Sequence, residues 1–179
     1  ANGTGDDIGA VIQDDGVALP LTPLTVNDTT YSFDVEVTND TGLPANLYAW
    51  IDFNKNGIFE GNEAAQPVIV PSSATNPRTF TVTFNGFSIT PPFDDTFVRV
   101  RLTTQTLINT NSSLLDEDTR SIGPARDGEV EDYLIEIVEL PPDCPPDQTI
   151  TIETSESSSG SVVAIDPQGY TISYSLANG

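Results

Sequence analysis

Apolar and polar side chains alternate through long parts of the first 140 residues. In residues 31–38, Tyr31, Phe33, Val35 and Val37 fall on one face of an extended chain, and the polar residues between them fall on the other. No segment shows the i, i+3, i+4 apolar spacing of an amphipathic helix. Such a chain buries its apolar side chains by packing sheets together, so we expect an all-β fold, an antiparallel β-sandwich of the immunoglobulin-like or jelly-roll-like kind.

Further strand-like runs follow the first, and each is bounded by clusters of Gly, Pro or Asn. They lie at residues 47–52, 68–70, 78–84, 97–102 and 133–138. Short strands at this spacing are typical of a sandwich.

The composition changes at residues 140–147, where two Pro-Pro pairs flank Cys144. Paired prolines stiffen a chain towards an extended form, so we predict a sandwich domain over 1–139, a linker over 140–147 and a C-terminal β segment over 148–179. Three strand-like runs in the last segment, at 148–154, 161–165 and 170–176, are too few to close a core. The segment is therefore either a fragment of a second β domain or a strand donor to a neighbouring copy.

The charge balance excludes several classes of function. The chain has 27 acidic and 6 basic residues, a net charge of −21, no His, no Met and one Cys. Nucleic-acid binding needs a basic surface, so the negative net charge excludes it. Triad catalysis needs an imidazole, and zinc or copper sites need imidazole or sulfur ligands, so the absence of His and Met excludes these functions as well. No apolar run is long enough to cross a membrane. Catalysis by a carboxylate pair would need an aromatic-lined cleft, whereas the aromatic residues here alternate as core residues do, so we expect no enzyme.

A twelve-residue calcium-loop pattern spans residues 52–63. The spacing D-x-[DN]-x-[DN]-G-x5-E is matched by Asp52, Asn54, Asn56, Gly57 and Glu63. Calcium takes six to eight oxygen ligands, and this spacing lets alternate side chains converge as the chain curls. The sequence therefore predicts a Ca²⁺ site, to which the carbonyl of Ile58 and the side chain of Glu60 also contribute.

The surroundings of this loop differ from those of an EF-hand. An EF-hand loop lies between two helices, but residues 48–51 are strand-like, so we expect only the loop chemistry. Two neutral Asn ligands favour weak affinity, in the extracellular range. The alternative is a metal-free hairpin built on Asx turns.

Arg99 and Arg101 fall on one face of a strand, and Glu129 and Glu131 on one face of another. We expect a cross-strand ion-pair network between them. The alternative is a second calcium or ligand site that includes Glu129, Glu131 and Asp132.

Several features indicate export from the cell. Asn2, Asn27, Asn39 and Asn111 begin N-x-[ST] sequons, which are potential glycosylation sites. The odd cysteine, Cys144, is either an incidental thiol or an intermolecular disulfide partner.

Four motifs together resemble a known family. They are Asp-Asp-Gly-Val at 14–17, Trp-Ile-Asp-Phe-Asn-Lys-Asn-Gly at 50–57, Phe-Val-Arg-Val-Arg at 97–101 and Asp-Gly-Glu-Val-Glu-Asp-Tyr at 127–133. In this order they resemble the GEVED domain of bacterial secreted and surface proteins, over residues 10–138. The resemblance implies a β-sandwich module without an activity of its own. It also implies that Asp52, Asn54, Asn56 and Glu63 form the calcium loop and that Glu129, Glu131 and Asp132 are important.

The chain departs from this family at its beginning, where Gly-Thr-Gly-Asp-Asp stands at 3–7 in place of an acidic stretch containing Asp-Pro. At the other end, residues 161–176 resemble the opening of a cadherin-like repeat.

These observations predict a non-enzymatic extracellular module. It would be a calcium-stabilised building block of a bacterial adhesin, stalk or filament, with neighbouring copies or modules as its partners. The alternative is a lectin-like domain whose calcium ion binds a glycan or a peptide.

Overall fold

The computed structural model describes residues 12–75, 77–143 and 163–174. The chain divides into two compact units, Ala1–Val138 and Glu139–Gly179. Each unit is considered by itself below.

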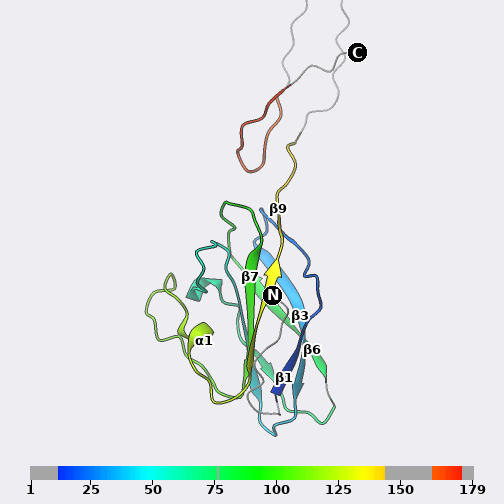
Figure 1. The fold of residues 1–179 in the computed structure, drawn as a ribbon, viewed down its shortest axis with the longest axis vertical. Helices are drawn as coiled ribbons and strands as arrows, with labels where there is room; N and C mark the ends of the chain where they lie inside the picture. Colours follow the sequence, from blue (N-terminus) through cyan, green and yellow to red (C-terminus); the bar gives the residue numbers. More distant parts are fainter. Residues whose placement is uncertain (1–11, 76, 144–162, 175–179) are drawn as a thin grey trace, which may run out of the picture. The chain divides into compact units, whose positions relative to one another are not determined.

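In its described residues, the first unit contains two antiparallel sheets and one small parallel pair (Figure 1). The three-stranded sheet has the order β1-β3-β6, and the four-stranded sheet has the order β5-β4-β7-β8. The strands are β1 (Ile12–Val17), β2 (Leu24–Thr25), β3 (Thr30–Asn39), β4 (Ala45–Ile51), β5 (Val68–Val70), β6 (Arg78–Asn85), β7 (Thr96–Thr103), β8 (Glu129–Ile135) and β9 (Ile137–Val138). The pair β2-β9 is parallel.

The core lies between the two larger sheets. The predicted inner face of β3 is confirmed, because Tyr31, Phe33, Val35 and Val37 are all buried. The same apolar cluster contains side chains from the opposite sheet: Leu47, Ala49, Ile51, Val98, Val100, Leu102, Tyr133 and Ile135. Residues two apart along each strand share a face, so alternation in the sequence becomes a sandwich core. The all-β, antiparallel prediction is therefore confirmed.

The predicted strand at 133–138 is divided in the structure. β8 begins earlier, at Glu129, and ends at Ile135, while Ile137 and Val138 form β9 and pair with β2. The described residues also include two short helices, the 3-10 helix η1 (Gly61–Glu63) and α1 (Thr119–Ile122).

A second apolar cluster lies on the outer face of the four-stranded sheet. Tyr48 and Trp50 of β4 stack with ring centroids 6.1 Å apart, and Phe59 completes the cluster. Leu107, from the segment between β7 and β8, packs against it. Both faces of β4 are thus covered, which explains why its burial does not alternate.

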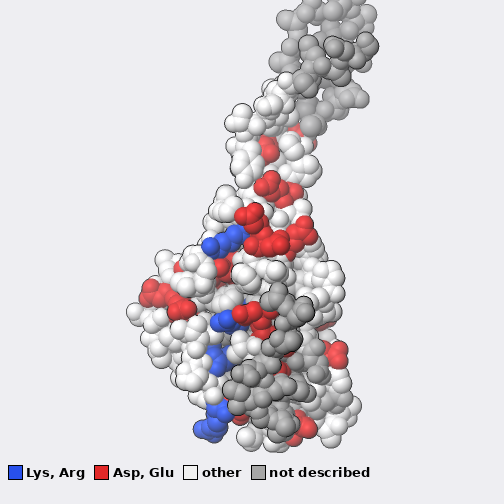
Figure 2. Space-filling view, in the orientation of Figure 1, with Lys and Arg blue, Asp and Glu red and all other residues white. Residues whose placement is uncertain are grey.

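The charges are unevenly distributed. Figure 2 shows acidic side chains spread over the visible face, while the basic ones gather along one side of it. Four of the six basic residues come from β7 and the segment between β7 and β8: Arg99, Arg101, Arg120 and Arg126.

In the second unit, residues 163–174 contain no strand, contrary to the predictions for 161–165 and 170–176 over their described parts. Instead Asp143 and Ile165 form an isolated antiparallel bridge. Residues 166–169, Asp-Pro-Gln-Gly, form a turn in which the amide of Gly169 donates to the carbonyl of Asp166 at 3.0 Å. Val163, Ile165 and Tyr174 are exposed, so these side chains are not buried as those of a sandwich strand are. The predicted strand at 148–154 and residues 144–147 of the predicted linker lie outside the described residues.

Candidate functional site

The twelve-residue loop leaves the sheet at the end of β4 and returns beside it. Asp52 follows β4 directly, and η1 forms the end of the loop. Beyond η1, Trp50 and Ala64 form an antiparallel bridge, and the amide of Ala65 donates to the carbonyl of Ala49 at 2.9 Å. The two ends of the loop are therefore held together by the sheet.

The first half of the loop curls around the carboxylate of Asp52. This side chain is only 4% exposed, and its two oxygens accept hydrogen bonds from the amides of Asn56 at 3.2 Å and Gly57 at 3.0 Å. Gly57 has φ 84°, which side chains disfavour, so a glycine suits this turn. The Oδ1 atom of Asn54 accepts from Asn56 N, and that of Asn56 accepts from Ile58 N. The curl expected from the spacing is present.

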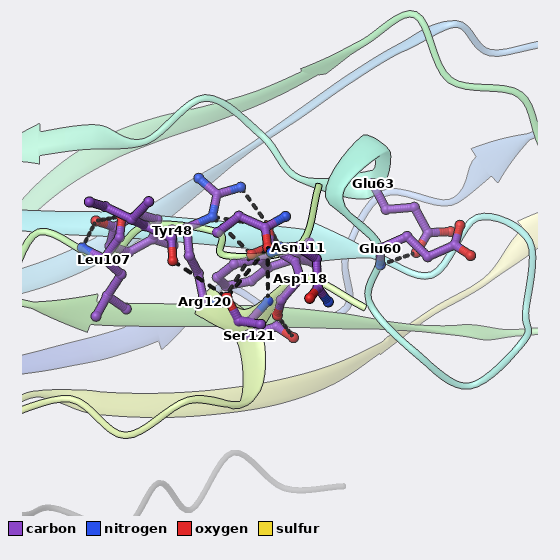
Figure 3. Close-up of polar contacts among 12 residues, drawn as sticks. Tyr48, Glu60, Glu63, Leu107, Asn111, Asp118, Arg120 and Ser121 are labelled. Atoms are coloured by element: carbon purple, nitrogen blue, oxygen red, sulfur yellow. Dashed lines mark hydrogen bonds and ion pairs between the residues drawn. The ribbon is translucent and has the colours of Figure 1, made fainter. Parts of the chain in front are cut away.

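Glu63 and Glu60 close the second half (Figure 3). Glu63 is 2% exposed, and its Oε1 accepts from the amides of Phe53 at 2.9 Å and Asn54 at 3.3 Å. Its Oε2 accepts from the amide of Glu60 at 3.0 Å. The carboxylate of Glu60 in turn accepts from the side-chain amides of Asn54 at 2.8 Å and Asn56 at 3.0 Å.

The loop concentrates negative charge without a basic partner. Asp52, Glu60 and Glu63 are all buried, and among the described residues no Lys or Arg forms an ion pair with any of them. Lys55, within the loop, donates instead to the carbonyl of Pro92. Burial, aided by the nearby charges of Asp52 and Glu60, raises the pKa of Glu63 to about 7 against the opposing effect of its backbone hydrogen bonds.

The donor set suits a hard cation. The side chains are not gathered around one point, however: within the described part of the chain, no three Asp, Glu, Cys or His side chains converge closely enough to hold a metal ion. The amides of Asn54 and Asn56 occupy the space beside Glu60 and present nitrogen to it. A half-turn of each amide would present oxygen instead, and carboxylate and amide oxygens are calcium ligands.

The second half of the loop is bound to the segment between β7 and β8. The amide of Asp118 donates to the carbonyl of Phe59 at 2.7 Å, and Asn62 N donates to the carbonyl of Leu114 at 2.9 Å. Glu60 and Glu117 form a further antiparallel bridge. The conformation of the loop is therefore coupled to this neighbouring segment.

Asp118, in the segment between β7 and β8, is a buried residue at the contact with the loop, and it was not predicted from the sequence. It is fully buried, caps α1, and accepts from Trp50 Nε1 at 3.1 Å and from Arg120 Nε at 3.0 Å (Figure 3). Arg120 also lies over the rings of Tyr48 and Trp50. Burial alone would raise the pKa of Asp118, but the hydrogen bonds from Arg120 and Trp50 outweigh burial and lower it. Asp118 lies in an Asp-Thr-Arg run within a long loop. Nothing in that sequence distinguishes a buried aspartate from a solvent-exposed one.

The predicted pairing of Arg99 and Arg101 with Glu129 and Glu131 is wrong. The register places Arg99 opposite Asp132, and Val100 and Leu102 opposite Glu131 and Glu129. Residues opposite one another share a face, so the two glutamates lie on the inner face and the two arginines on the outer face.

The ion pair of this sheet joins Arg99 to Asp132 instead. Both pairs of atoms are 2.7 Å apart, so the contact is bidentate. Because Asp132 lies on the outer face and Glu129 and Glu131 on the inner face, the three carboxylates do not converge on one ion. The predicted second calcium site from these three residues is therefore not formed.

Comparison with known families adds to this geometry. Residues 46–136 match the family model of the GEVED domain, which is more than half of the chain. The chain belongs to the GEVED domain family. No curated protein and no solved structure matched it. GEVED is a domain of extracellular proteins, and among the described residues there is no helix long and apolar enough to span a membrane.

The letters of the GEVED name are residues 128–132 of this chain, and the structure gives several of them a role in the fold. Gly128 passes against β7, Glu131 accepts a hydrogen bond from the hydroxyl of Tyr133, and Asp132 holds Arg99. The hydroxyl of Tyr133 also accepts from the amide of Val17 at 3.2 Å, which joins β8 to β1 in the other sheet. In this GEVED domain, Glu131 of the motif therefore holds the hydroxyl of Tyr133, the residue that joins the two layers of the sandwich.

The sequons differ in accessibility. Asn39 is fully buried, and its side-chain amide donates to the carbonyls of Leu43 and Val70, so the prediction of a glycan there is wrong. Asn27 and Asn111 are exposed, although the side-chain amide of Asn111 donates to the carbonyl of Glu117 at 2.6 Å. Asn2 and Cys144 lie outside the described residues.

Proposed function

We propose that this GEVED domain is a non-enzymatic structural module that calcium rigidifies. It serves as a building block of a bacterial surface adhesin, stalk or filament. Calcium binds in the loop at 52–63 through Asp52, Asn54, Asn56, Glu60 and Glu63 and the carbonyl of Ile58.

One observation carries the proposal: three buried carboxylates share this loop, and no described basic side chain pairs with them. Burying uncompensated charge is costly, and a divalent cation removes that cost. It also changes the net charge of the chain from −21 to −19 per ion, which weakens self-repulsion.

The setting supports an extracellular role. Loops with fewer charged ligands bind calcium weakly, and weak sites are filled where calcium is millimolar, outside cells. Because the bound loop is also tied to the segment between β7 and β8, calcium would stiffen a larger part of the outer face than the loop itself.

Calcium binding is tested by thermal unfolding of the full chain with EDTA and with added calcium. Free calcium at a hundred times its Kd contributes about 2.7 kcal/mol, which raises the melting temperature by roughly 5–10 °C. Glu63→Gln keeps the shape of a buried ligand and removes its charge. We therefore expect that calcium no longer raises the melting temperature of this variant.

The matched control is Glu136→Gln, which changes an exposed glutamate. It should retain the full response to calcium. Identical melting curves of the wild-type protein with EDTA and with calcium would contradict the proposed site.

A second candidate function, calcium-dependent ligand binding, is supported by a small hollow beside the loop. The hollow has a volume of about 200 Å³ and is lined by Asp52, Gly57, Phe59, Phe97, Arg99 and Asp132. Phe97 is 48% exposed, as the aromatic platforms of sugar sites are. Retention on an immobilised glycan that is lost with EDTA and with Phe97→Ala would favour this lectin-like function over a purely structural one.

Assembly through the C-terminal segment is the further part of the proposal. Val163, Ile165 and Tyr174 are all more than 45% exposed. Such side chains are available to complete a sheet in a neighbouring copy, and head-to-tail donation generates an open fibre.

A further inference from the structure

Arg101 is a buried cation whose charge is not neutralised by an ion pair within the described residues. It lies in β7 and is 5% exposed, opposite Tyr48 of β4 on one side and Val130 of β8 on the other. Its Nη1 donates to the carbonyl of Arg120 at 2.7 Å. Across the described ranges, no carboxylate oxygen lies within 4.0 Å of its guanidinium nitrogens, since the ion pairs found there belong to Arg99 and Arg120.

This arrangement is unfavourable for the protein alone. A guanidinium has five N–H donors, and a buried charge is normally paired. Burial lowers the pKa of Arg101, and the neighbouring charge of Arg99 lowers it further. Both effects act against the cation, so an anion beside it would be stabilising.

The protein has space for such an anion. A cavity of about 300 Å³ is lined by Arg101, Pro124, Ala125, Arg126 and Val130, together with residues 127–129. Arg126 is exposed, so it is accessible from solvent. The cavity therefore combines one buried arginine, one accessible arginine and apolar walls.

Two acidic residues, Asp127 and Glu129, also line the cavity, and each has interactions other than an ion pair with Arg101. Asp127 accepts from Thr103 Oγ1 at 2.7 Å and from the amide of Thr104 at 2.9 Å. Glu129 is paired with Leu102 in the register, which places it on the inner face of the sheet. Neither residue forms an ion pair with Arg101.

We propose that this cavity binds a carboxylate group, held by the guanidinium of Arg101 and assisted by Arg126. A planar fork of N–H donors matches the two oxygens of a carboxylate. The volume accommodates a group of the size of one acidic side chain or one uronic acid. This site uses none of the calcium-loop residues and is independent of the proposed calcium binding.

The site is tested by titrating the ¹⁵N-labelled full chain with glutarate and with glucuronate, at constant ionic strength and saturating calcium. Because the net charge of −21 repels anions in general, saturable binding must be local. We expect saturable shifts at millimolar ligand in the amides of residues 125–130. Tighter binding of glucuronate indicates a glycan source for the carboxylate, and tighter binding of glutarate indicates an acidic side chain.

Arg126→Gln, at an exposed position, should weaken binding roughly tenfold, and Arg101→Met should abolish it. Arg78→Gln, in β6 of the other sheet, is the matched control and should bind as the wild type does. The proposal is overturned if residues 125–130 show no saturable shifts. It is equally overturned if Arg126→Gln binds unchanged, or if sulfate binds as tightly as the two carboxylates.

Discussion

At the scale of single residues, the fold depends most directly on the space beside Gly128. Gly128 has φ 93°, and a Cβ atom there would lie 1.7 Å from the carbonyl oxygen of Leu102 in β7. Real Cβ contacts never approach so closely, so the neighbouring strand would have to move. The first residue of the GEVED motif, Gly128, is therefore a glycine because any side chain there would clash with the backbone of β7.

Gly128→Ala should lower the free energy of unfolding by about 4 kcal/mol or more, because it adds a backbone clash to left-handed strain. Gly86→Ala is the matched control: Gly86 has φ 74°, and a Cβ atom added there would meet no other atom within 4 Å. It should cost only about 1–2 kcal/mol, from strain alone. Urea unfolding of both variants measures the difference, and equal losses would contradict the steric account.

At the scale of elements, β8 sorts its acidic side chains between two faces. Glu129 and Glu131 are buried on the inner face, and Asp132 reaches Arg99 on the outer face. A shift of one residue in register would exchange the two sets, so the Arg99–Asp132 pair also specifies how β8 aligns with β7.

A double-mutant cycle with Arg99→Gln and Asp132→Asn should give a coupling energy on the order of 0.5–3 kcal/mol, since the pair is bidentate. The comparison cycle combines Arg99→Gln with Glu131→Gln, whose side chains lie on opposite faces of the sheet. It should be additive within about 0.5 kcal/mol. Coupling in the comparison cycle and none in the first would contradict the register described above.

At the scale of the whole molecule, the chain divides after Val138. The sandwich has its own core, whereas the described part of the second unit exposes its large apolar side chains. Burial of apolar side chains therefore stabilises the sandwich, and it contributes little over residues 163–174.

Removal of residues 139–179 should leave a folded sandwich that still responds to calcium, because its core comes from residues before the division. If the second unit donates strands, assemblies of the full chain disappear in the truncated protein. Light scattering measures the oligomeric state, and circular dichroism confirms that the shortened chain is folded. The same oligomeric state in both proteins would count against donation and favour a fragment of a second β domain.

The fold class and the local shape of the loop could both be predicted from residue spacing. Alternation of period two depends only on the geometry of an extended chain, so the inner face of β3 could be assigned before any partner strand was known. The curl at 52–63 likewise depends on contacts between residues at most eleven positions apart, and Gly57 takes the positive φ that the pattern requires.

The contacts between residues far apart in the chain could not be predicted in this way. The pairing of Arg99 with Asp132, the burial of Asn39 and the hydrogen bond from Trp50 to Asp118 depend on strand register and on a long loop that folds back over the sheet. The cavity at Arg101 arises in the same way, from β7 and the segment that precedes β8. A one-residue change in register moves every side chain of a strand to the other face, and no local property of the sequence sets that register, because it depends on packing between residues far apart in the chain.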